Sequence, residues 1–326
     1  MSRRRRPSRI HGLLPVFKTA GPTSHDVVDM ARLALGERRI GHTGTLDPMA
    51  EGLLLLCVGN ATRLQRFLMD WEKAYRGVVR LGHATTTYDL EGEAMDPRGP
   101  VPVVGPAELE TLRERFSGDI DQVPPPYSAK KVEGKKMYEL ARDGQAVELE
   151  AKRVTVRDLE LSVIDPERLE VRVTCSTGFY VRSLAYDLGV ALGCGGHLES
   201  LLREGIGPYT IDVALPQAVL GAGPNADTIV GGPAWVPLDD IRLPFPDLAV
   251  NRGAAERFLH GQETVVFRSG GGDDLSPEAS VCVRDEGGTL LGVGTVQSVL
   301  ARGRTVGVRP SVVLATAVAD REHQTH

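Results

Sequence analysis

The sequence has few cysteines, and none of them are closely spaced. Cys57, Cys175, Cys194 and Cys282 form no C-x-x-C pair. This spacing argues against a zinc knuckle and against a disulfide framework. We therefore expect buried free thiols in a reducing compartment, and a cytoplasmic protein.

Long apolar runs are also missing. No stretch approaches the roughly 20 apolar residues of a membrane span, so we expect no membrane partner. The first residues, MSRRRRPSRIHG, are basic with no apolar segment behind them. We expect a solvated, disordered tail over residues 1–11 rather than a secretory signal, and an RNA-contacting arm is the alternative.

The chain has no excess of positive charge. Its formal net charge is −5, with 41% hydrophobic and 25% charged residues. These values are ordinary for a protein with a real core, and they leave room for a local basic groove. A length of 326 residues favours one large domain and one smaller one.

Strand-like and helix-like stretches alternate over the first two thirds of the chain. We expect helices at residues 24–35, with Ser24 as N-cap, and at 106–116 and 180–192. We expect strands at residues 52–59, 73–85 and 168–176. The Gly- and Pro-rich residues 214–240 suggest a linker or irregular connector. Residues 246–314 fit a small β-rich domain with one helix near 253–259.

The first candidate for chemistry is Asp47 in GHTGTLDPMAEGLLLL. Small residues precede this single carboxylate, Pro48 fixes the backbone after it, and an apolar strand follows. An Asx-type turn before the strand is the plain alternative. A phosphate-binding loop is disfavoured because the G-x-x-x-x-G-K-[ST] pattern is absent.

The second candidate is Arg182 in CSTGFYVRSLAYDLG. A cation near a helix start is disfavoured by the helix dipole, so a buried carboxylate partner is the functional interpretation and a surface arginine the simpler one. Cys175 has no nearby histidine in sequence to activate it as a nucleophile.

Two further segments hold aromatic and basic residues. Tyr75 lies in the alternating segment KAYRG, where a strand tyrosine usually packs in the core. The segment DQVPPPYSAKKVEGKKMYELAR combines Lys130, three more lysines and two tyrosines. That mixture suits phosphates and bases, although for this segment alone a solvated charged loop is the favoured explanation.

Taken together and in this order, the four segments resemble the TruB family of tRNA pseudouridine synthases. The likeness covers residues 12–213, and GHTGTLDPMAEGLLL matches the family's catalytic-aspartate motif at nearly every position. It implies an α/β (α+β) protein of the pseudouridine synthase fold. That fold has a mixed, largely antiparallel central sheet flanked by helices.

The resemblance also implies the activity, isomerisation of uridine 55 in the T loop of tRNA without metal or organic cofactor. Asp47 would be the catalytic carboxylate and Arg182 its ion-pair partner, while Tyr75 would lie against the flipped uracil. His42, Tyr180, Leu201, Lys18 and Lys130 would contact the substrate or line its pocket. The uracil must leave the stack of the loop to reach Asp47.

The chain departs from the family pattern in places. The usual Asp-Lys-Pro-x-Gly-x-Thr-Ser stretch reads FKTAGPTS here, and Leu202 stands where the first of two arginines is common, leaving Arg203. The second change implies one phosphate contact fewer. The implied division is a catalytic domain at 12–240, a small PUA-like RNA-binding domain at 241–316 and a frayed tail at 317–326.

Alternative functions differ in what they need from Asp47. A tRNA-folding chaperone would need binding but no chemistry, and a nucleotide-binding enzyme would need a phosphate loop. A synthase with another RNA target, in a guide-RNA particle or on mRNA, would keep the chemistry. The chain lacks long Lys-rich extensions, so we expect a monomeric, stand-alone bacterial enzyme that contacts the T arm and the acceptor stem.

Overall fold

The computed structural model describes residues 9–126, 131–132, 135–136, 150–268 and 275–314. Within them, one large mixed sheet has eleven strands, and its main path runs β14-β1-β3-β12-β4-β11-β10-β7. Its strands are β1 (Gly12–Lys18), β2 (Ile40–His42), β3 (Glu51–Val58), β4 (Lys73–Leu81), β7 (Gly118–Gln122), β10 (Lys152–Asp165), β11 (Arg168–Cys175), β12 (Gly196–Ile206), β13 (Tyr209–Thr210), β14 (Leu215–Pro216) and β15 (Val236–Pro237). Within this sheet, the described parallel pairs are β1 with β14 and β3 with β12, and the other described pairs are antiparallel. The predicted mixed, largely antiparallel sheet is therefore confirmed.

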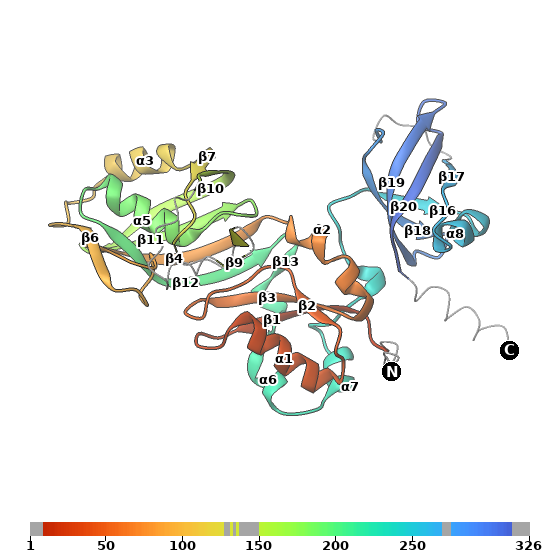
Figure 1. Ribbon diagram of the computed structural model, residues 1–326, viewed down its shortest axis with the longest axis horizontal. Helices are drawn as coiled ribbons and strands as arrows, with labels where there is room; N and C mark the ends of the chain where they lie inside the picture. Colours follow the sequence, from red (N-terminus) through yellow and green to blue (C-terminus); the bar gives the residue numbers. More distant parts are fainter. Residues whose placement is uncertain (1–8, 127–130, 133–134, 137–149, 269–274, 315–326) are drawn as a thin grey trace.

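Helices cover this sheet in two groups, which Figure 1 shows beside β1 and beside β10 and β11. The α-helices are α1 (Ser24–Leu35), α2 (Gln65–Met69), α3 (Pro106–Arg115), α5 (Val181–Ala191), α6 (Gln217–Gly221) and α7 (Ala226–Val230). The 3-10 helices are η1 (Gly59–Arg63), η2 (Ile211–Val213) and η3 (Leu238–Asp240). Two short hairpins are β5 (His83–Thr85) with β6 (Ala94–Arg98), and β8 (Lys131–Val132) with β9 (Lys135–Lys136).

The apolar run of β3 is explained by its place in the sheet. β3 lies between β1 and β12, and Leu53 to Val58 are fully buried. A strand covered on both faces has no solvent side, so its sequence does not alternate. Gly52 has φ +106°, and a Cβ there would lie 2.3 Å from the backbone oxygen of Arg203. The glycine therefore permits the close approach of β12 directly after the Asp47 loop.

Two predicted element boundaries need correction. The N-cap of α1 is Thr23, which forms a capping box with Asp26, and not Ser24. The expected single strand over 73–85 breaks at Gly82, whose φ of +109° suits glycine, into β4 and β5.

Residues 214–240 are not a linker. β14 and β15 pair with β1, and the backbone of Asn225, just before α7, donates to Ala34 O in α1. Short edge elements therefore complete the large sheet and cover α1. A composition rich in glycine and proline fits such elements as well as it fits a linker.

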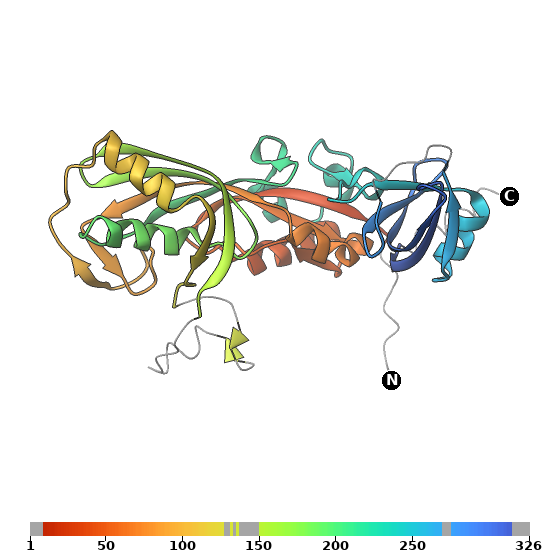
Figure 2. The same cartoon turned by 90° about the horizontal axis from the view of Figure 1, so that it is seen from above.

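The predicted small β-rich C-terminal unit is confirmed. Its sheet has the order β16-β18-β19-β20-β17 and packs against α8 around Phe258. The elements are β16 (Asp247–Val250), α8 (Arg252–Leu259), β17 (Thr264–Phe267), β18 (Ser280–Asp285), β19 (Leu290–Leu300) and β20 (Thr305–Val313). Figure 2 shows it at one end of the molecule. One apolar cluster joins Leu13 and Leu53 of the large sheet to Val293 and Val312 of the small one.

Candidate active site

The loop between β2 and β3 carries Asp47 and is anchored at its middle by Ser24. The Ser24 hydroxyl donates to Leu46 O at 2.9 Å and accepts from Leu46 N at 2.8 Å. Ser24 is the first residue of α1 and is buried. Ser24, which we predicted to be the N-cap of α1, therefore fixes Leu46, the residue directly before Asp47.

Two fully buried cations, Lys18 and Arg203, hold the carbonyl oxygens of the same loop. The ammonium of Lys18 in β1 lies 3.2 Å from the oxygens of Asp47 and Pro48 and 2.7 Å from that of Ala50. Its side chain is fully buried. Burial lowers the pKa of Lys18, and the carboxylates of Asp47 and Glu51 oppose that shift. The predicted contact of Lys18 with RNA is untested, and the contacts present are with the loop.

Arg203 holds the loop from its other side. Its guanidinium donates to Leu53 O at 2.7 Å, Thr45 O at 3.2 Å and Gly44 O at 3.0 Å. The side chain is buried, so all these donors serve the protein interior. Sequence reasoning had considered this position only for phosphate contacts. It missed the clamp, because the pairing of β12 with β3 joins residues 150 apart in the chain.

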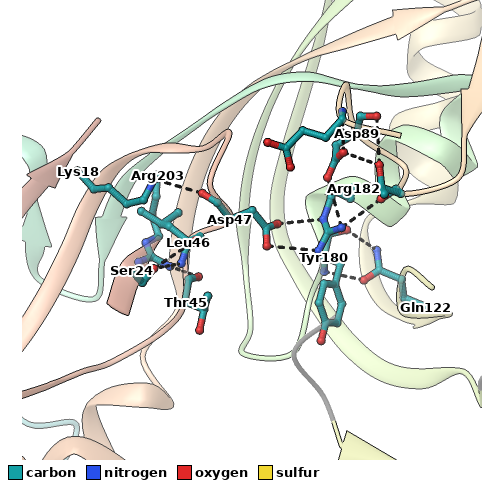
Figure 3. Close-up of polar contacts among 12 residues, drawn as sticks. Lys18, Ser24, Thr45, Leu46, Asp47, Asp89, Gln122, Tyr180, Arg182 and Arg203 are labelled. Atoms are coloured by element: carbon teal, nitrogen blue, oxygen red, sulfur yellow. Dashed lines mark hydrogen bonds and ion pairs between the residues drawn. The ribbon is translucent and has the colours of Figure 1, made fainter. Parts of the chain in front are cut away.

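The carboxylate of Asp47 forms an ion pair with Arg182 of α5. Nε of Arg182 lies 2.9 Å from Oδ2, and Nη2 lies 3.4 Å from Oδ1 (Figure 3). The Arg182 side chain is 7% exposed, whereas that of Asp47 is 35% exposed. Arg182 therefore has the carboxylate partner that was expected, and that partner is only half-buried. The ion pair fixes the orientation of the carboxylate, and enough of Asp47 remains open for a substrate to touch.

A second carboxylate, Asp89, completes the surroundings of Arg182. Nη1 of Arg182 lies 3.3 Å from Asp89 Oδ2 and donates to Thr87 O at 3.1 Å. Asp89 is 3% exposed, and its other oxygen accepts from the Thr87 hydroxyl and from Glu91 N. Arg182 is thus fixed from both sides. Sequence reasoning did not assign Asp89, which lies in a turn with no periodicity to mark it.

Tyr75 and His42 lie on neighbouring parts of the sheet and are both uncharged at neutral pH. Tyr75 of β4 is the register partner of Arg203. Burial raises the pKa of Tyr75, and the guanidinium of Arg203 opposes this shift. Burial lowers the pKa of His42, as does Arg203. The Nδ1 atom of His42 accepts a hydrogen bond from Gly44 N at 3.3 Å.

Tyr180 and Leu201 complete the predicted set within the described residues. Tyr180 is the N-cap of α5, and its backbone exchanges hydrogen bonds of 2.8 and 3.1 Å with the Gln122 side chain. Figure 3 shows it beside Arg182. Leu201 is 9% exposed and shares a cluster with Leu46 and Tyr75. Lys130 lies outside the described residues.

In the described part of the chain, no helix combines the length and apolar character needed to cross a membrane.

The described cysteines are buried and unpaired. Burial raises the pKa of the Cys175 thiol to about 12, which opposes formation of a thiolate nucleophile. Cys175 is therefore a poor candidate for a nucleophile, and Asp47 stays the candidate for the chemistry of this site.

Comparisons with known proteins find related sequences over most of this chain. The family model described as TruB family pseudouridylate synthase (N terminal domain) matches residues 32–181. A protein of Chromohalobacter salexigens named tRNA pseudouridine synthase B is 41% identical over 270 residues, 83% of this chain and 87% of that protein. A Burkholderia mallei protein of the same name is 40% identical over 298 residues, 91% of this chain and 97% of that protein.

A solved structure shares the fold. A chain of a Cbf5-Nop10-Gar1 complex superposes with a TM-score of 0.69 at 22% identity, over 93% of this chain and 84% of that one.

Proposed function

Because the chain belongs to the TruB family of pseudouridylate synthases, we propose that it isomerises uridine 55 in the T loop of tRNA to pseudouridine. The names of its relatives support a tRNA substrate, and the four motifs support the position. The observation that carries the proposal is the Asp47 carboxylate, partly open to solvent and held by the buried guanidinium of Arg182.

The reaction consumes nothing and changes no oxidation level overall. The bond between N1 of uracil and C1′ of ribose breaks, the base turns, and C5 bonds to C1′. C5 gives up its hydrogen, and N1 gains one. A carboxylate can begin this sequence in three ways: by attacking C1′, by attacking C6 of the ring, or by taking a proton on a route through a glycal. Each of the three requires Asp47 to be ionised.

The surroundings of Asp47 hold its carboxylate in a fixed position. Arg182 supplies the opposite charge, and Asp89 fixes Arg182 in turn. Lys18, Ser24 and Arg203 hold the backbone on either side of the carboxylate. Little reorganisation is then needed when the substrate arrives, which is how a preorganised site lowers a barrier.

The uracil must leave the stack of the RNA loop to reach Asp47. Tyr75 offers a neutral aromatic ring, and Leu201 an apolar wall, which compensate for lost stacking. We assign His42 and Tyr180 to contacts with the same uracil or its neighbours, as the resemblance implies. Because the pKa of Tyr75 is raised, its phenol acts at neutral pH as a hydrogen-bond donor or a relay for the C5 proton, not as a standing anion.

The remaining partner assignments follow from the same proposal. The enzyme acts as a cytoplasmic monomer, with residues 12–240 as the catalytic domain and 241–316 as a PUA-like domain that reaches the acceptor stem. In the described part of that domain, Phe267 is 77% exposed and Leu300 61% exposed, both as register partners of Thr305. Arg302 and Arg304 are exposed beside them, which gives an aromatic and basic surface suited to RNA.

The test is tritium release from a tRNA transcript labelled with [5-³H]uridine only at position 55. The wild-type protein is expected to release the label, and Asp47→Asn to do so more slowly by a factor on the order of 10³ or more. An Asp240→Asn protein makes the same charge change at an exposed position and serves as the control. Circular dichroism checks the folding of each variant.

Two results would contradict the proposal. Release by Asp47→Asn at the wild-type rate would remove the carboxylate from the chemistry. Tritium release from transcripts labelled at other uridines, with none from position 55, would support the isomerisation reaction and contradict the T-loop target.

A further inference from the structure

Lys73, the lysine of the KAYRG segment, lies beside the Asp47 loop but outside the site described above. It begins β4 two residues before Tyr75, so the two side chains lie on the same face of the strand. Lys73 is 6% exposed. A Cβ on Gly44 would lie 3.5 Å from Nη1 of Arg203 and 3.9 Å from Cε of Lys73. Two cationic side chains therefore lie close behind Gly44, in the loop that leads to Asp47.

The ammonium of Lys73 is bound at the end of α2. Its Nζ atom donates to Trp71 O at 2.7 Å and to the carbonyl oxygen of Met69, the last residue of α2. The end of β12 holds this segment in turn, because Gly207 N donates to Glu72 O at 2.9 Å. The Trp71 ring also packs so closely that a Cβ on Gly207 would lie 2.5 Å from its Cδ2 atom. The ammonium is thus anchored to a fixed part of the chain.

α2 supports the segment before Asp47 from both of its ends. At its start, Nε2 of Gln65 donates to His42 O at 2.8 Å. A Cβ on Gly41 would lie 2.4 Å from Oε1 of Gln65, so the glycine permits this approach. Just beyond its end, Lys73 lies behind Gly44. The two supports therefore act two residues apart in the segment that precedes Asp47.

Burial of this ammonium is not needed to cap a helix. A lysine that only caps can bury its stem and keep its charged group in water. Burial lowers the pKa of Lys73 from 10.5 to about 8, as does the nearby guanidinium of Arg203, while Cys175 and Asp70 oppose the shift. Groups with strongly shifted pKa values gather at functional sites, where a cost of this kind is tolerated.

We propose that Lys73 is a positioning residue of the reaction, and that its protonated side chain fixes the Gly44 side of the Asp47 loop against the end of α2. This inference rests on the proposed function and adds to it a residue that acts through the loop. A charged donor makes hydrogen bonds roughly twice as strong as a neutral one. When the proton is lost, the bonds to Met69 and Trp71 weaken, and Gly44 loses its support.

The proposal predicts opposite changes in stability and rate. Between about pH 8 and 10.5, the unfolded chain keeps a proton on Lys73 that the folded protein has lost. The contribution of Lys73 to the free energy of unfolding therefore rises with pH across this window. The reaction rate should instead fall as pH rises through about 8, because the positioning charge is lost. A residue that served only the stability of the fold would change both in the same direction.

The experiment measures single-turnover tritium release at saturating concentrations of tRNA labelled at position 55, between about pH 6.5 and 9.5 at constant ionic strength. It compares the wild type with Lys73→Arg, which stays charged throughout, and with Lys73→Met, which keeps an apolar stem. Lys152→Met changes an exposed lysine of β10 and is the control. Urea unfolding over the same pH range measures the stability of each protein, and the difference from Lys73→Met isolates the contribution of Lys73.

The wild-type rate is expected to be about fivefold lower at pH 9 than at pH 7, while its stability relative to Lys73→Met rises. Lys73→Arg should keep its pH 7 rate up to pH 9. Lys73→Met should be about tenfold slower than the wild type at pH 7 and show no further fall. Lys152→Met should follow the wild type.

Three results would overturn the role of Lys73: a wild-type rate in Lys73→Met at pH 7, the same fall with pH in the wild type and in Lys73→Arg, or a wild-type rate that is constant from pH 7 to 9. The third test needs no variant, so it holds even if a substitution prevents folding. A rate that falls together with the stability of the wild type would also contradict the proposal.

The same measurements separate this inference from the proposed function. Absence of release from position 55 by the wild type at every pH would reject the proposed function. Release from position 55 with equal rates and pH profiles in all four proteins would reject only the role of Lys73 and leave the function standing.

Discussion

The ring of Tyr186 stacks on the ring of Tyr88, with centroids 4.1 Å apart and planes inclined by 13°. Tyr88 lies between Thr87 and Asp89, the two residues of that turn that contact Arg182. Its φ is +63°, a conformation that costs a bulky residue energy and needs support from its surroundings. Tyr186 lies one helical turn after Arg182, on the same face of α5. The stack on Tyr88 and the ion pair with Asp89 therefore hold residues 87–89 against one face of this helix.

Replacing Tyr186 by leucine should therefore weaken catalysis without touching the substrate. Loss of the stack, worth about 0.5 to 1.5 kcal/mol, lets the Asp89 turn move relative to Arg182. We expect the single-turnover rate at saturating tRNA to fall roughly 2- to 10-fold, with tRNA affinity retained. Tyr186→Phe keeps the ring and should restore the rate. A Phe variant as slow as the Leu variant would contradict a stacking role.

The two carboxylates around Arg182 predict that lysine cannot replace it. An ammonium is a point charge and cannot match Asp47 and Asp89 at once as the planar guanidinium does. Arg182→Lys should lower the single-turnover rate about 100-fold and reduce the stability of the fold, since Asp89 is buried. Thermal unfolding and tritium release measure the two effects. Arg168→Lys, at a half-exposed pair with Asp165, is the control. A wild-type rate in Arg182→Lys would show that the second carboxylate is irrelevant.

Lys18 gives a prediction that separates loop support from RNA contact. Lys18→Met keeps the apolar stem and removes the donor to three loop carbonyls. Losing buried hydrogen bonds from a charged group costs about 1.5 to 3 kcal/mol. We expect lower thermal stability and a lower rate at saturating tRNA, with KM nearly unchanged. A raised KM with an unchanged saturating rate would instead support the RNA contact that the family resemblance implies.

The features predicted from sequence were those whose causes are local. The burial of β3 follows from an unbroken apolar run, and the need of Arg182 for a carboxylate follows from its place near a helix start. The predicted roles of Asp47, Tyr75 and the other site residues rest on the resemblance and await the experiments above.

The missed features depend on contacts between distant parts of the chain. Arg203 reaches the Asp47 loop only because β12 pairs with β3, and Asp89 reaches Arg182 only through the turn at Tyr88. Ser24 looked like a helix cap because its hydroxyl precedes an apolar helical pattern. Thr23 takes that role and leaves Ser24 for Leu46. No periodicity or composition of a single segment contains this information.

The half-buried carboxyl of Asp187, next to Tyr186 on α5, predicts a pH dependence of stability. Burial raises the pKa of Asp187 from 3.8 to about 6, against an opposing effect of Arg115. Between these two values the folded protein keeps a proton that the unfolded chain has lost. The free energy of unfolding therefore falls as pH rises from about 4 to 6, and the penalty remains at higher pH.

Asp187→Asn removes that penalty, because an amide has no charge to desolvate. The variant should be more stable than the wild type at pH 7, by on the order of 1 to 3 kcal/mol, and the two should converge near pH 4. Urea unfolding across this pH range measures the difference, with Asp240→Asn as the exposed control. A constant difference between variant and wild type at every pH would trace the effect to packing. A variant less stable at pH 7 would show that the ionised carboxylate is favourable where it lies.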